Sequence, residues 1–211
     1  MFNELFEEKH TYRNLVGGKW IESKTGKLID IYSPIDGSLV GRVPAMSKDE
    51  VNHVIKIANE SQRHWMNYPM NKKAEILYRA ADILDERAEE MGKILTYEIA
   101  KDKKSAIGEV NRTADFIRFT ADAAKSLEGD VLPGDSFPGT KRNKLSFVRR
   151  VPLGVVLAIS PFNYPINLSA SKIAPALMAG NAVVLKPPTR RSMSSLFLAQ
   201  VFKAAGVPDG V

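Results

Sequence analysis

Residues 151–188 read VPLGVVLAISPFNYPINLSASKIAPALMAGNAVVLKPP and carry the clearest structural signal in the chain. Two apolar runs in this stretch, residues 154–159 and 182–185, do not alternate with polar residues, which is typical of strands buried on both faces of a parallel sheet. A helical segment at residues 167–179 separates the two runs, and a second one follows at residues 192–205. This order predicts a βαβ crossover and an α/β fold with an incomplete doubly wound, Rossmann-like parallel sheet.

The preceding stretch, residues 128–151, loses the helical period and predicts a protruding β-hairpin. Pro-Gly pairs at residues 133–134 and 138–139 mark turns, and Leu145 and Phe147 alternate with polar residues. Only Phe147 interleaves with the cations of this stretch, which favours a solvated or subunit-contacting face over a nucleic-acid contact. The cations are Lys141, Arg142, Lys144, Arg149 and Arg150.

Further toward the amino terminus, apolar periodicity predicts three helices. Ser47 and Glu50 form a capping box that begins the first helix. The third, at about residues 106–127, has one apolar stripe that includes Ala106 and a second that includes Phe119, so we expect it to be sandwiched between other elements. The second, a single long helix, carries apolar residues at helical spacing: Leu77, Ala81, Leu84, Ala88, Met91 and Leu95. Before these helices, short apolar runs broken by turn dipeptides predict a small antiparallel sheet: residues 19–22, 28–32 and 39–43.

The composition excludes several classes of protein. Of 211 residues, 44% are hydrophobic and 26% are charged, which is the mixture of a globular domain and not of a disordered chain. The chain contains no cysteine, which excludes disulfide scaffolds, zinc ribbons and a thiol nucleophile within it. The three histidines lie in the amino-terminal third without partners at metal spacing, so we expect no metal site.

Targeting and membrane segments are also not expected. The longest apolar runs fall short of the roughly 20 residues that span a bilayer. The first ten residues, MFNELFEEKH, are too acidic and too poor in apolar side chains for a signal peptide. We therefore expect a cytoplasmic protein without a membrane partner.

Ligands of open α/β sheets bind beyond the carboxyl ends of the strands, which here are followed by residues 160–166 and 186–191. The first loop has no glycine, so the usual dinucleotide fingerprint is absent, and its Asn163 could either donate an N–H to an oxyanion or cap a turn. In the second loop, Lys186 stands where an ordinary NAD site has an acidic residue. Lys186 and the Thr189 hydroxyl suit a ribose 2′-phosphate; the alternative is a solvated lysine, with Thr189 capping the next helix. We expect Asn163 and Lys186 to face one crevice.

Residues 151–165 (VPLGVVLAISPFNYP) and 172–188 (KIAPALMAGNAVVLKPP) resemble the aldehyde dehydrogenase superfamily. Gly18-Lys-Trp20 and Pro34-x-x-Gly37 agree with its pattern in order, so the resemblance covers essentially the whole chain. Within the superfamily, three motifs are similar to those of the NADP-dependent non-phosphorylating glyceraldehyde-3-phosphate dehydrogenases: Ser160-Pro-Phe-Asn-Tyr-Pro, Lys186-Pro-Pro-Thr189 and Glu109-Val-x-Arg112-Thr113.

The resemblance implies a role for each candidate residue. Asn163 would be the side-chain half of an oxyanion hole, which stabilises the thiohemiacetal oxygen formed when a cysteine thiolate attacks the aldehyde. Lys186 and Thr189 would hold the adenosine ribose of NADP and its 2′-phosphate. Arg112 and Tyr164 would contact the phosphate of the substrate. Backbone groups would line the cofactor at four further residues: Ile159, Ser160, Pro161 and Phe162.

The resemblance also implies that the chain is an amino-terminal fragment. The nucleophilic cysteine, the general-base glutamate and the glycine-rich turn of the family are absent from these 211 residues, so the fragment would be inactive alone. Its expected parts are strands and helices of the cofactor domain (residues 1–128), an oligomerisation hairpin (129–151) and the first part of the dinucleotide-binding fold (152–211). Lys172 would have a supporting role at most.

The parent enzyme would oxidise glyceraldehyde 3-phosphate to 3-phosphoglycerate with NADP and would form a homo-oligomer through the hairpin. Two alternatives stay open. One is an aldehyde dehydrogenase for another small or acidic aldehyde, such as lactaldehyde or a semialdehyde. The other is a non-catalytic nucleotide-binding or assembly module.

Overall fold

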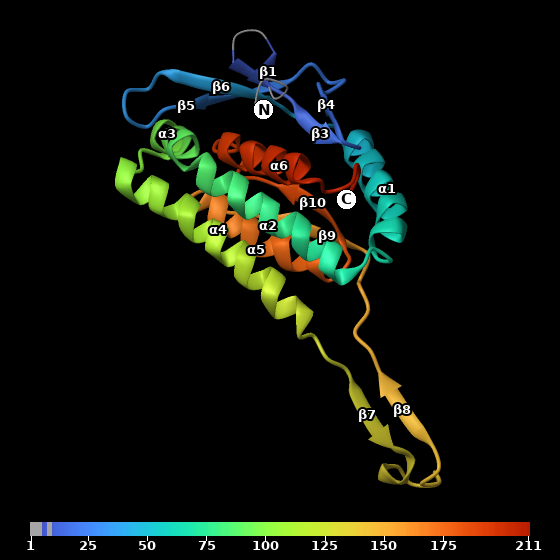
Figure 1. Ribbon diagram of the computed structural model, residues 1–211. Helices are drawn as coiled ribbons and strands as arrows, with labels where there is room; N and C mark the ends of the chain where they lie inside the picture. Colours follow the sequence, from blue (N-terminus) through green and yellow to red (C-terminus); the bar gives the residue numbers. More distant parts are fainter. Residues whose placement is uncertain (1–5, 8–9) are drawn as a thin grey trace.

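The structure is a computed structural model that describes residues 6–7 and 10–211 (Figure 1). In this part of the chain, small sheets cover one end, helices and a pair of parallel strands form the body, and a long hairpin projects away from it. The expectation about a signal peptide concerns residues 1–10, most of which lie outside the described residues. None of the described helices is long and apolar enough to cross a membrane.

The amino-terminal strands form two small sheets. In one, the strand order is β1 (Phe6–Glu7), β2 (Thr11–Tyr12), β6 (Leu39–Pro44) and β5 (Leu28–Tyr32). In the other, β3 (Asn14–Val16) pairs antiparallel with β4 (Lys19–Ile21). The three predicted runs are present as β4, β5 and β6, and each pairs antiparallel with a neighbour, but β4 lies in a separate sheet from β5 and β6, and β2 pairs parallel with β6. Strands of two or three residues are too short for an alternating pattern to reveal them.

Helix α1 (Lys48–Trp65) begins at the predicted capping box. The Ser47 hydroxyl accepts a hydrogen bond of 3.2 Å from the Glu50 N–H, and the Glu50 carboxylate accepts one of 2.8 Å from the Ser47 N–H. The same carboxylate accepts a bond of 2.7 Å from the Lys24 N–H, which connects the helix to the loop after β4. These bonds from backbone N–H groups lower the pKa of Glu50 to about 2.

The long second helix of the prediction is two helices, α2 (Met70–Glu86) and α3 (Ala88–Ile99). The chain bends at Arg87, whose φ of −107° and ψ of 11° lie outside the helical region. An unbroken apolar period does not reveal this bend, because both helices pack on the same core. The predicted apolar residues on both sides of the bend are buried: Leu77, Ala81, Leu84, Ala88, Met91 and Leu95.

Helix α4 (Lys103–Lys125) corresponds to the third predicted helix but is buried along only one of its two apolar stripes. The stripe that starts at Ala106 is fully buried and packs on α2, α3 and α5 (Pro165–Met178). In the second stripe, Phe119 is 70% exposed and Ala123 is also exposed. The expectation of a sandwiched helix is therefore wrong for the described part of the chain, in which α4 lies at the outer surface (Figure 1).

The predicted crossover connects two parallel strands, β9 (Val155–Ile159) and β10 (Ala182–Lys186). Helix α5 lies between them in sequence, and α6 (Met193–Ala205) follows β10. Helix α5 begins at Pro165, earlier than predicted, because proline fits the first helical position, where its missing N–H breaks no hydrogen bond. The Asn181 Oδ1 accepts a hydrogen bond of 2.9 Å from the Gly154 N–H. This bond connects the two residues that directly precede β10 and β9.

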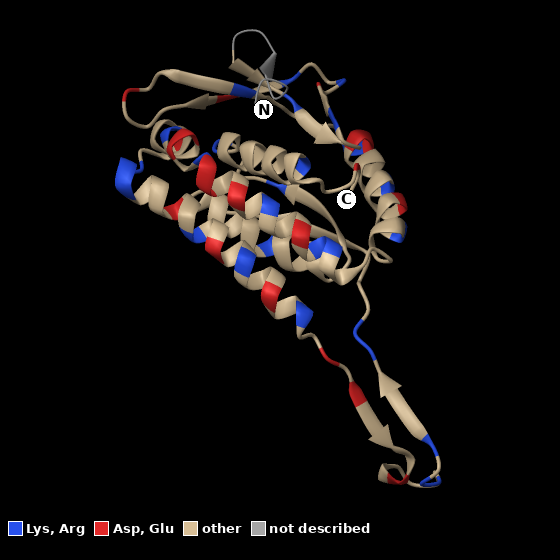
Figure 2. Ribbon diagram, in the orientation of Figure 1, with Lys and Arg blue, Asp and Glu red and all other residues tan. Residues whose placement is uncertain are grey.

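The predicted hairpin consists of β7 (Asp130–Pro133), the short 3₁₀ helix η3 (Gly134–Ser136) and β8 (Leu145–Val148), with the two strands antiparallel. It projects from the body between α4 and β9 (Figure 1). Its cations gather at the tip and at the base (Figure 2). Its apolar side chains are also exposed, among them Phe147 at 72%.

Candidate functional site

The carboxyl ends of β9 and β10 lie side by side. Ile159 pairs with Lys186, and the Ser160 N–H donates a hydrogen bond of 3.3 Å to the Lys186 carbonyl oxygen. Residues 160–164 and 187–191 therefore leave the same edge of the parallel pair, which is the edge where open α/β sheets bind ligands. The structure thus brings together three of the predicted cofactor residues, Ile159, Ser160 and Lys186.

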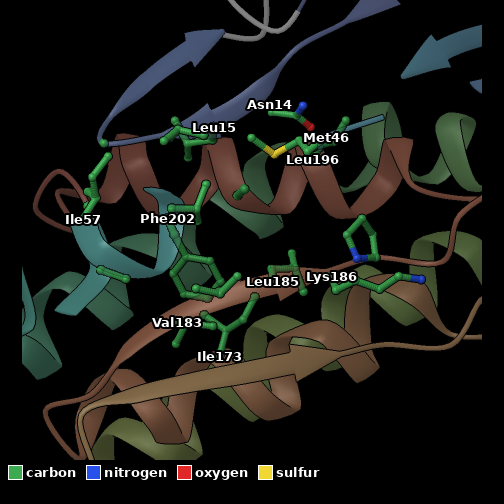
Figure 3. Close-up of a pocket in the computed structure, with 18 of the residues that line it drawn as sticks. Asn14, Leu15, Met46, Ile57, Ile173, Val183, Leu185, Lys186, Leu196 and Phe202 are labelled. Atoms are coloured by element: carbon green, nitrogen blue, oxygen red, sulfur yellow. The ribbon is translucent and has the colours of Figure 1, made fainter. Parts of the chain in front are cut away.

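Lys186 and Thr189 line an apolar cavity of about 540 Å³, with Lys186 at one end of it (Figure 3). The Lys186 Nζ donates a hydrogen bond of 3.3 Å to the Thr189 Oγ1, and both side chains are exposed. Lys186 forms no ion pair with any residue that the structure describes. An unpaired ammonium beside a hydroxyl is a donor set that fits a phosphate group. Apolar side chains from three helices and β10 form much of the cavity wall: Ile57, Ile173, Val183, Leu185, Leu196 and Phe202.

The cavity does not extend to Asn163. Its lining includes Lys186 and Thr189 but no residue of the loop 160–164. The crevice expected between Asn163 and Lys186 therefore stays a prediction. What connects the two residues is the paired end of β9 and β10.

The loop 160–164 rests on a buried group of serines. The Ser160 hydroxyl accepts a hydrogen bond of 2.9 Å from the Ser169 Oγ, which lies 3.3 Å from the Ser195 Oγ. The Asn163 side chain is exposed and makes no hydrogen bond to another described residue, so it does not cap the turn. Its amide is therefore open to a ligand. The other exposed residues of the loop are Pro161, Phe162 and Tyr164.

Arg112 and Tyr164 lie near each other. The guanidinium carbon of Arg112 is 6.0 Å from the centroid of the Tyr164 ring, and both side chains are exposed. Within the described residues, Arg112 has no carboxylate partner. An unpaired guanidinium at the surface can bind a phosphate or carboxylate from solution.

Glu98 of α3, which sequence reasoning missed, caps α6. Its carboxylate is fully buried and accepts hydrogen bonds from the N–H groups of Met193 (2.7 Å) and Ser194 (3.0 Å). Burial raises the pKa of Glu98, against the opposing effects of these bonds and of the Arg191 charge. Thr189 consequently does not cap this helix, because the N-cap position is Ser192 and the first N–H groups bind Glu98.

Glu109 of α4 caps α5 in the same way. Its Oε1 accepts hydrogen bonds from the N–H groups of Ile166 (3.0 Å) and Asn167 (3.2 Å), and the side chain is fully buried. The residue at the N-cap position, Tyr164, makes no side-chain cap. Both glutamates have a sequence signal, because each is a carboxylate on an otherwise apolar stripe of its helix. In addition, neither α5 nor α6 has a side-chain cap of its own, so their first N–H groups need another acceptor.

Lys172 makes a local contact. Its Nζ donates a hydrogen bond of 3.1 Å to the Leu168 carbonyl oxygen of its own helix. No group of three or more His, Cys, Asp or Glu side chains among the described residues could hold a metal ion.

Comparison with known proteins identifies the family. The model of the aldehyde dehydrogenase family matches residues 20–211. An NADP-dependent glyceraldehyde-3-phosphate dehydrogenase from Streptococcus equinus is 52% identical over 200 residues, which cover 95% of this chain and 42% of that protein. A protein of the same name from Triticum aestivum is 44% identical and covers 95% of this chain and 41% of its own length.

A solved structure agrees. The NADP-dependent glyceraldehyde-3-phosphate dehydrogenase from Bacillus halodurans C-125, complexed with NADP, superposes with a TM-score of 0.92 at 50% identity, over 94% of this chain and 42% of that chain. The chain thus spans about two fifths of the length of the relatives that it matches. These findings confirm the resemblance noted in the sequence: the chain belongs to the aldehyde dehydrogenase family.

Proposed function

We propose that the chain is part of an NADP-dependent aldehyde dehydrogenase that oxidises glyceraldehyde 3-phosphate to 3-phosphoglycerate. The observation that supports this proposal is the pairing of Ile159 with Lys186 at one sheet edge, because backbone groups that would contact a dinucleotide then lie beside a cation and a hydroxyl. The names of the Streptococcus and Bacillus relatives support the same cofactor and substrate.

The cofactor residues follow from the donor chemistry of this edge. The Lys186 ammonium and the Thr189 hydroxyl would bind the 2′-phosphate of NADP, a group for which both are suitable donors. When bound, NADP supplies the hydride acceptor, and the residues of this chain bind and orient it. Its contacts with backbone groups would be made by Ile159, Ser160, Pro161 and Phe162.

The substrate residues lie on the loop after β9 and on α4. The Asn163 side-chain N–H would donate a hydrogen bond to the aldehyde oxygen as negative charge develops there. Arg112 and Tyr164 would bind the phosphate, for which an exposed and unpaired guanidinium is well suited. Lys172 would support this centre only indirectly.

The 211 residues contain no cysteine, so we propose that the chain alone has no dehydrogenase activity by thiol chemistry. Residues 1–128 and 152–211 would form parts of the cofactor domain. The hairpin at residues 129–151 would join copies of the whole enzyme into a homo-oligomer, because it exposes Phe147 and neighbouring apolar side chains.

The test is a fusion of this chain to the carboxyl-terminal remainder of the Streptococcus equinus relative, called here the fusion enzyme. We expect it to form NADPH when given glyceraldehyde 3-phosphate, and the separate chain to form none. A folded fusion enzyme that reduces NAD in strong preference to NADP, or that ignores the phosphorylated aldehyde, would contradict the proposal.

A second substrate class has one observation in its favour. A relative named alpha-ketoglutaric semialdehyde dehydrogenase, from Bacillus subtilis, is 35% identical over 97% of this chain, and Arg112 could bind a carboxylate as well as a phosphate. Comparing kcat/KM of the fusion enzyme for the two aldehydes separates these cases. A non-catalytic module would instead bind NADP tightly as the separate chain, which titration calorimetry would detect.

A further inference from the structure

Lys101 contacts both residues that directly precede α5. Its Nζ lies 3.5 Å from the centroid of the Tyr164 ring and donates a hydrogen bond of 3.4 Å to the Asn163 carbonyl oxygen. The Lys101 side chain is only 12% exposed, so its ammonium has little access to water. A cation shielded from water and placed on the face of a ring is attracted to that ring, which favours one position of Tyr164.

Glu109 connects this lysine to the helix that follows. Its Oε2 accepts a hydrogen bond of 2.5 Å from the Lys101 Nζ, while its Oε1 binds the N–H groups of Ile166 and Asn167. One buried carboxylate therefore joins the cation that contacts residues 163–164 to the first turn of α5. A fully buried carboxylate depends on such partners, because water cannot replace them.

Apart from these contacts, the Tyr164 carbonyl oxygen accepts a hydrogen bond of 2.8 Å from the Leu168 N–H of α5. The side chains of residues 161–164 are exposed, and the serine contacts of the loop end at Ser160. Lys101 lies between α3 and α4, and among the described residues it is the side chain that donates a hydrogen bond to the Asn163 backbone. Loss of the lysine would therefore free the Asn163 backbone and the Tyr164 ring together.

We infer that the Lys101–Glu109 ion pair positions Asn163 and Tyr164 for the reaction. The inference rests on the proposed function, because that function assigns Asn163 to the reacting oxygen. Neither Lys101 nor Glu109 is assigned to touch substrate or cofactor; both act through the two residues that they hold. A displacement of a substrate-positioning group by about 1 Å can lower a rate by roughly 100-fold.

The kinetic test uses the fusion enzyme with Lys101→Met, which removes the ammonium and keeps most of the side-chain length. We expect kcat for glyceraldehyde 3-phosphate to fall by about 100-fold. The KM for NADP should stay unchanged, because Lys186 and Thr189 are not touched. Lys101→Arg keeps a cation and should restore most of kcat. The matched control is Lys103→Met, at a lysine whose side chain is 66% exposed, and it should change neither value.

A structural test uses the 211-residue chain and does not require activity. In Lys101→Met, amide hydrogen exchange at Ile166 and Asn167 should accelerate by about 10-fold, because the carboxylate that binds these groups has lost its cation. Exchange at Met193 and Ser194, which bind Glu98 instead, should not change. These two amides therefore report any general loss of stability.

Unchanged kcat and unchanged exchange in Lys101→Met would each overturn the inference. Equal acceleration at all four amides would also overturn it, because the effect would then be general unfolding. If the unsubstituted fusion enzyme is folded but inactive, the proposed function fails, while the exchange comparison still decides whether Lys101 holds this segment.

Discussion

The carboxylate of Glu98 accepts a hydrogen bond of 2.7 Å from the backbone N–H of Met193, which lies 95 residues further along the chain. The same carboxyl group binds the Ser194 N–H, so α3 is joined to the first turn of α6 by a fully buried side chain. The loop at residues 187–191, which carries Thr189, therefore lies between two fixed points, Lys186 at the end of β10 and the start of α6.

Replacement of Glu98 should destabilise the chain strongly. Glu98→Ala leaves two N–H groups buried without an acceptor, each of which costs about 1–3 kcal/mol, so we expect the free energy of unfolding to fall by about 2–6 kcal/mol. Urea denaturation of the 211-residue chain measures this change. Glu86→Ala, at an exposed position of α2, is the control and should change stability by less than about 0.5 kcal/mol. Equal effects of the two substitutions would contradict the structural role of Glu98.

The raised pKa of Glu98 predicts a pH dependence of stability. Because the folded chain binds this proton more tightly than the unfolded chain does, the stabilisation is fully present below the ordinary glutamate pKa and is lost as pH rises through the raised value. Glu98→Gln cannot titrate and lacks this component. Urea denaturation should be measured from below the ordinary glutamate pKa to above the raised pKa of Glu98. As pH rises over this range, the unsubstituted chain should lose stability relative to Glu98→Gln. A pH-independent difference would rule out titration of Glu98 as the cause.

Lys186 should control the choice of cofactor. Lys186→Glu in the fusion enzyme replaces the cation proposed for the 2′-phosphate by an anion, which removes a charge-assisted bond worth about 1.5–3 kcal/mol. The ratio of kcat/KM for NADP to that for NAD should then fall by at least about 10- to 100-fold. Steady-state kinetics with both cofactors measures the ratio. The matched control is Lys48→Glu on α1, at an exposed lysine, and a comparable fall there would point to a general effect of charge.

Arg112 should act on the charged end of the substrate. In the fusion enzyme, Arg112→Leu removes the exposed guanidinium near Tyr164 and should raise KM for glyceraldehyde 3-phosphate by about 10- to 100-fold. The KM for unphosphorylated glyceraldehyde should not change, because that aldehyde has no anionic group. Initial-rate measurements with both aldehydes test this. Equal changes for both would show that Arg112 does not recognise the phosphate.

The hairpin should determine the oligomeric state of the fusion enzyme. An isolated two-stranded hairpin is marginally stable in water, and Phe147 is 72% exposed on this one, so we expect a second copy to cover it. Phe147→Asp should lower the mass measured by light scattering. Ser146→Asp introduces the same charge on the opposite face of β8 and should leave the mass unchanged. The same mass for all three proteins would exclude Phe147 from the subunit contact.

Much of the fold could be predicted from local patterns. The apolar runs of β9 and β10 and the capping box at Ser47 depend on neighbouring residues, so the sequence reveals them directly. The bend at Arg87 could not be predicted, because the apolar period continues through it. The outward stripe at Phe119 was not predictable either, since periodicity alone does not say what covers a helix face.

The candidate site was predictable only in part. Residues 159–164 and 186–189 lie at the carboxyl ends of the two predicted strands, so sheet topology predicts their place, although the strands are only partly buried, with Leu157 62% exposed. Glu98 and Glu109 act on amides 95 and 57 residues away, and no local spacing encodes such a contact. Their only sequence signal is a carboxylate on an otherwise apolar stripe.

The amino ends of α5 and α6 are both occupied by the protein's own carboxylates, Glu109 and Glu98. Backbone amides there cannot serve as the phosphate cradle that other nucleotide-binding folds form from a helix terminus. In the proposed function, anion selectivity at this edge depends on the side chains of Lys186 and Thr189. One or two substitutions at these positions would therefore change the cofactor preference and leave the backbone contacts at this edge unchanged.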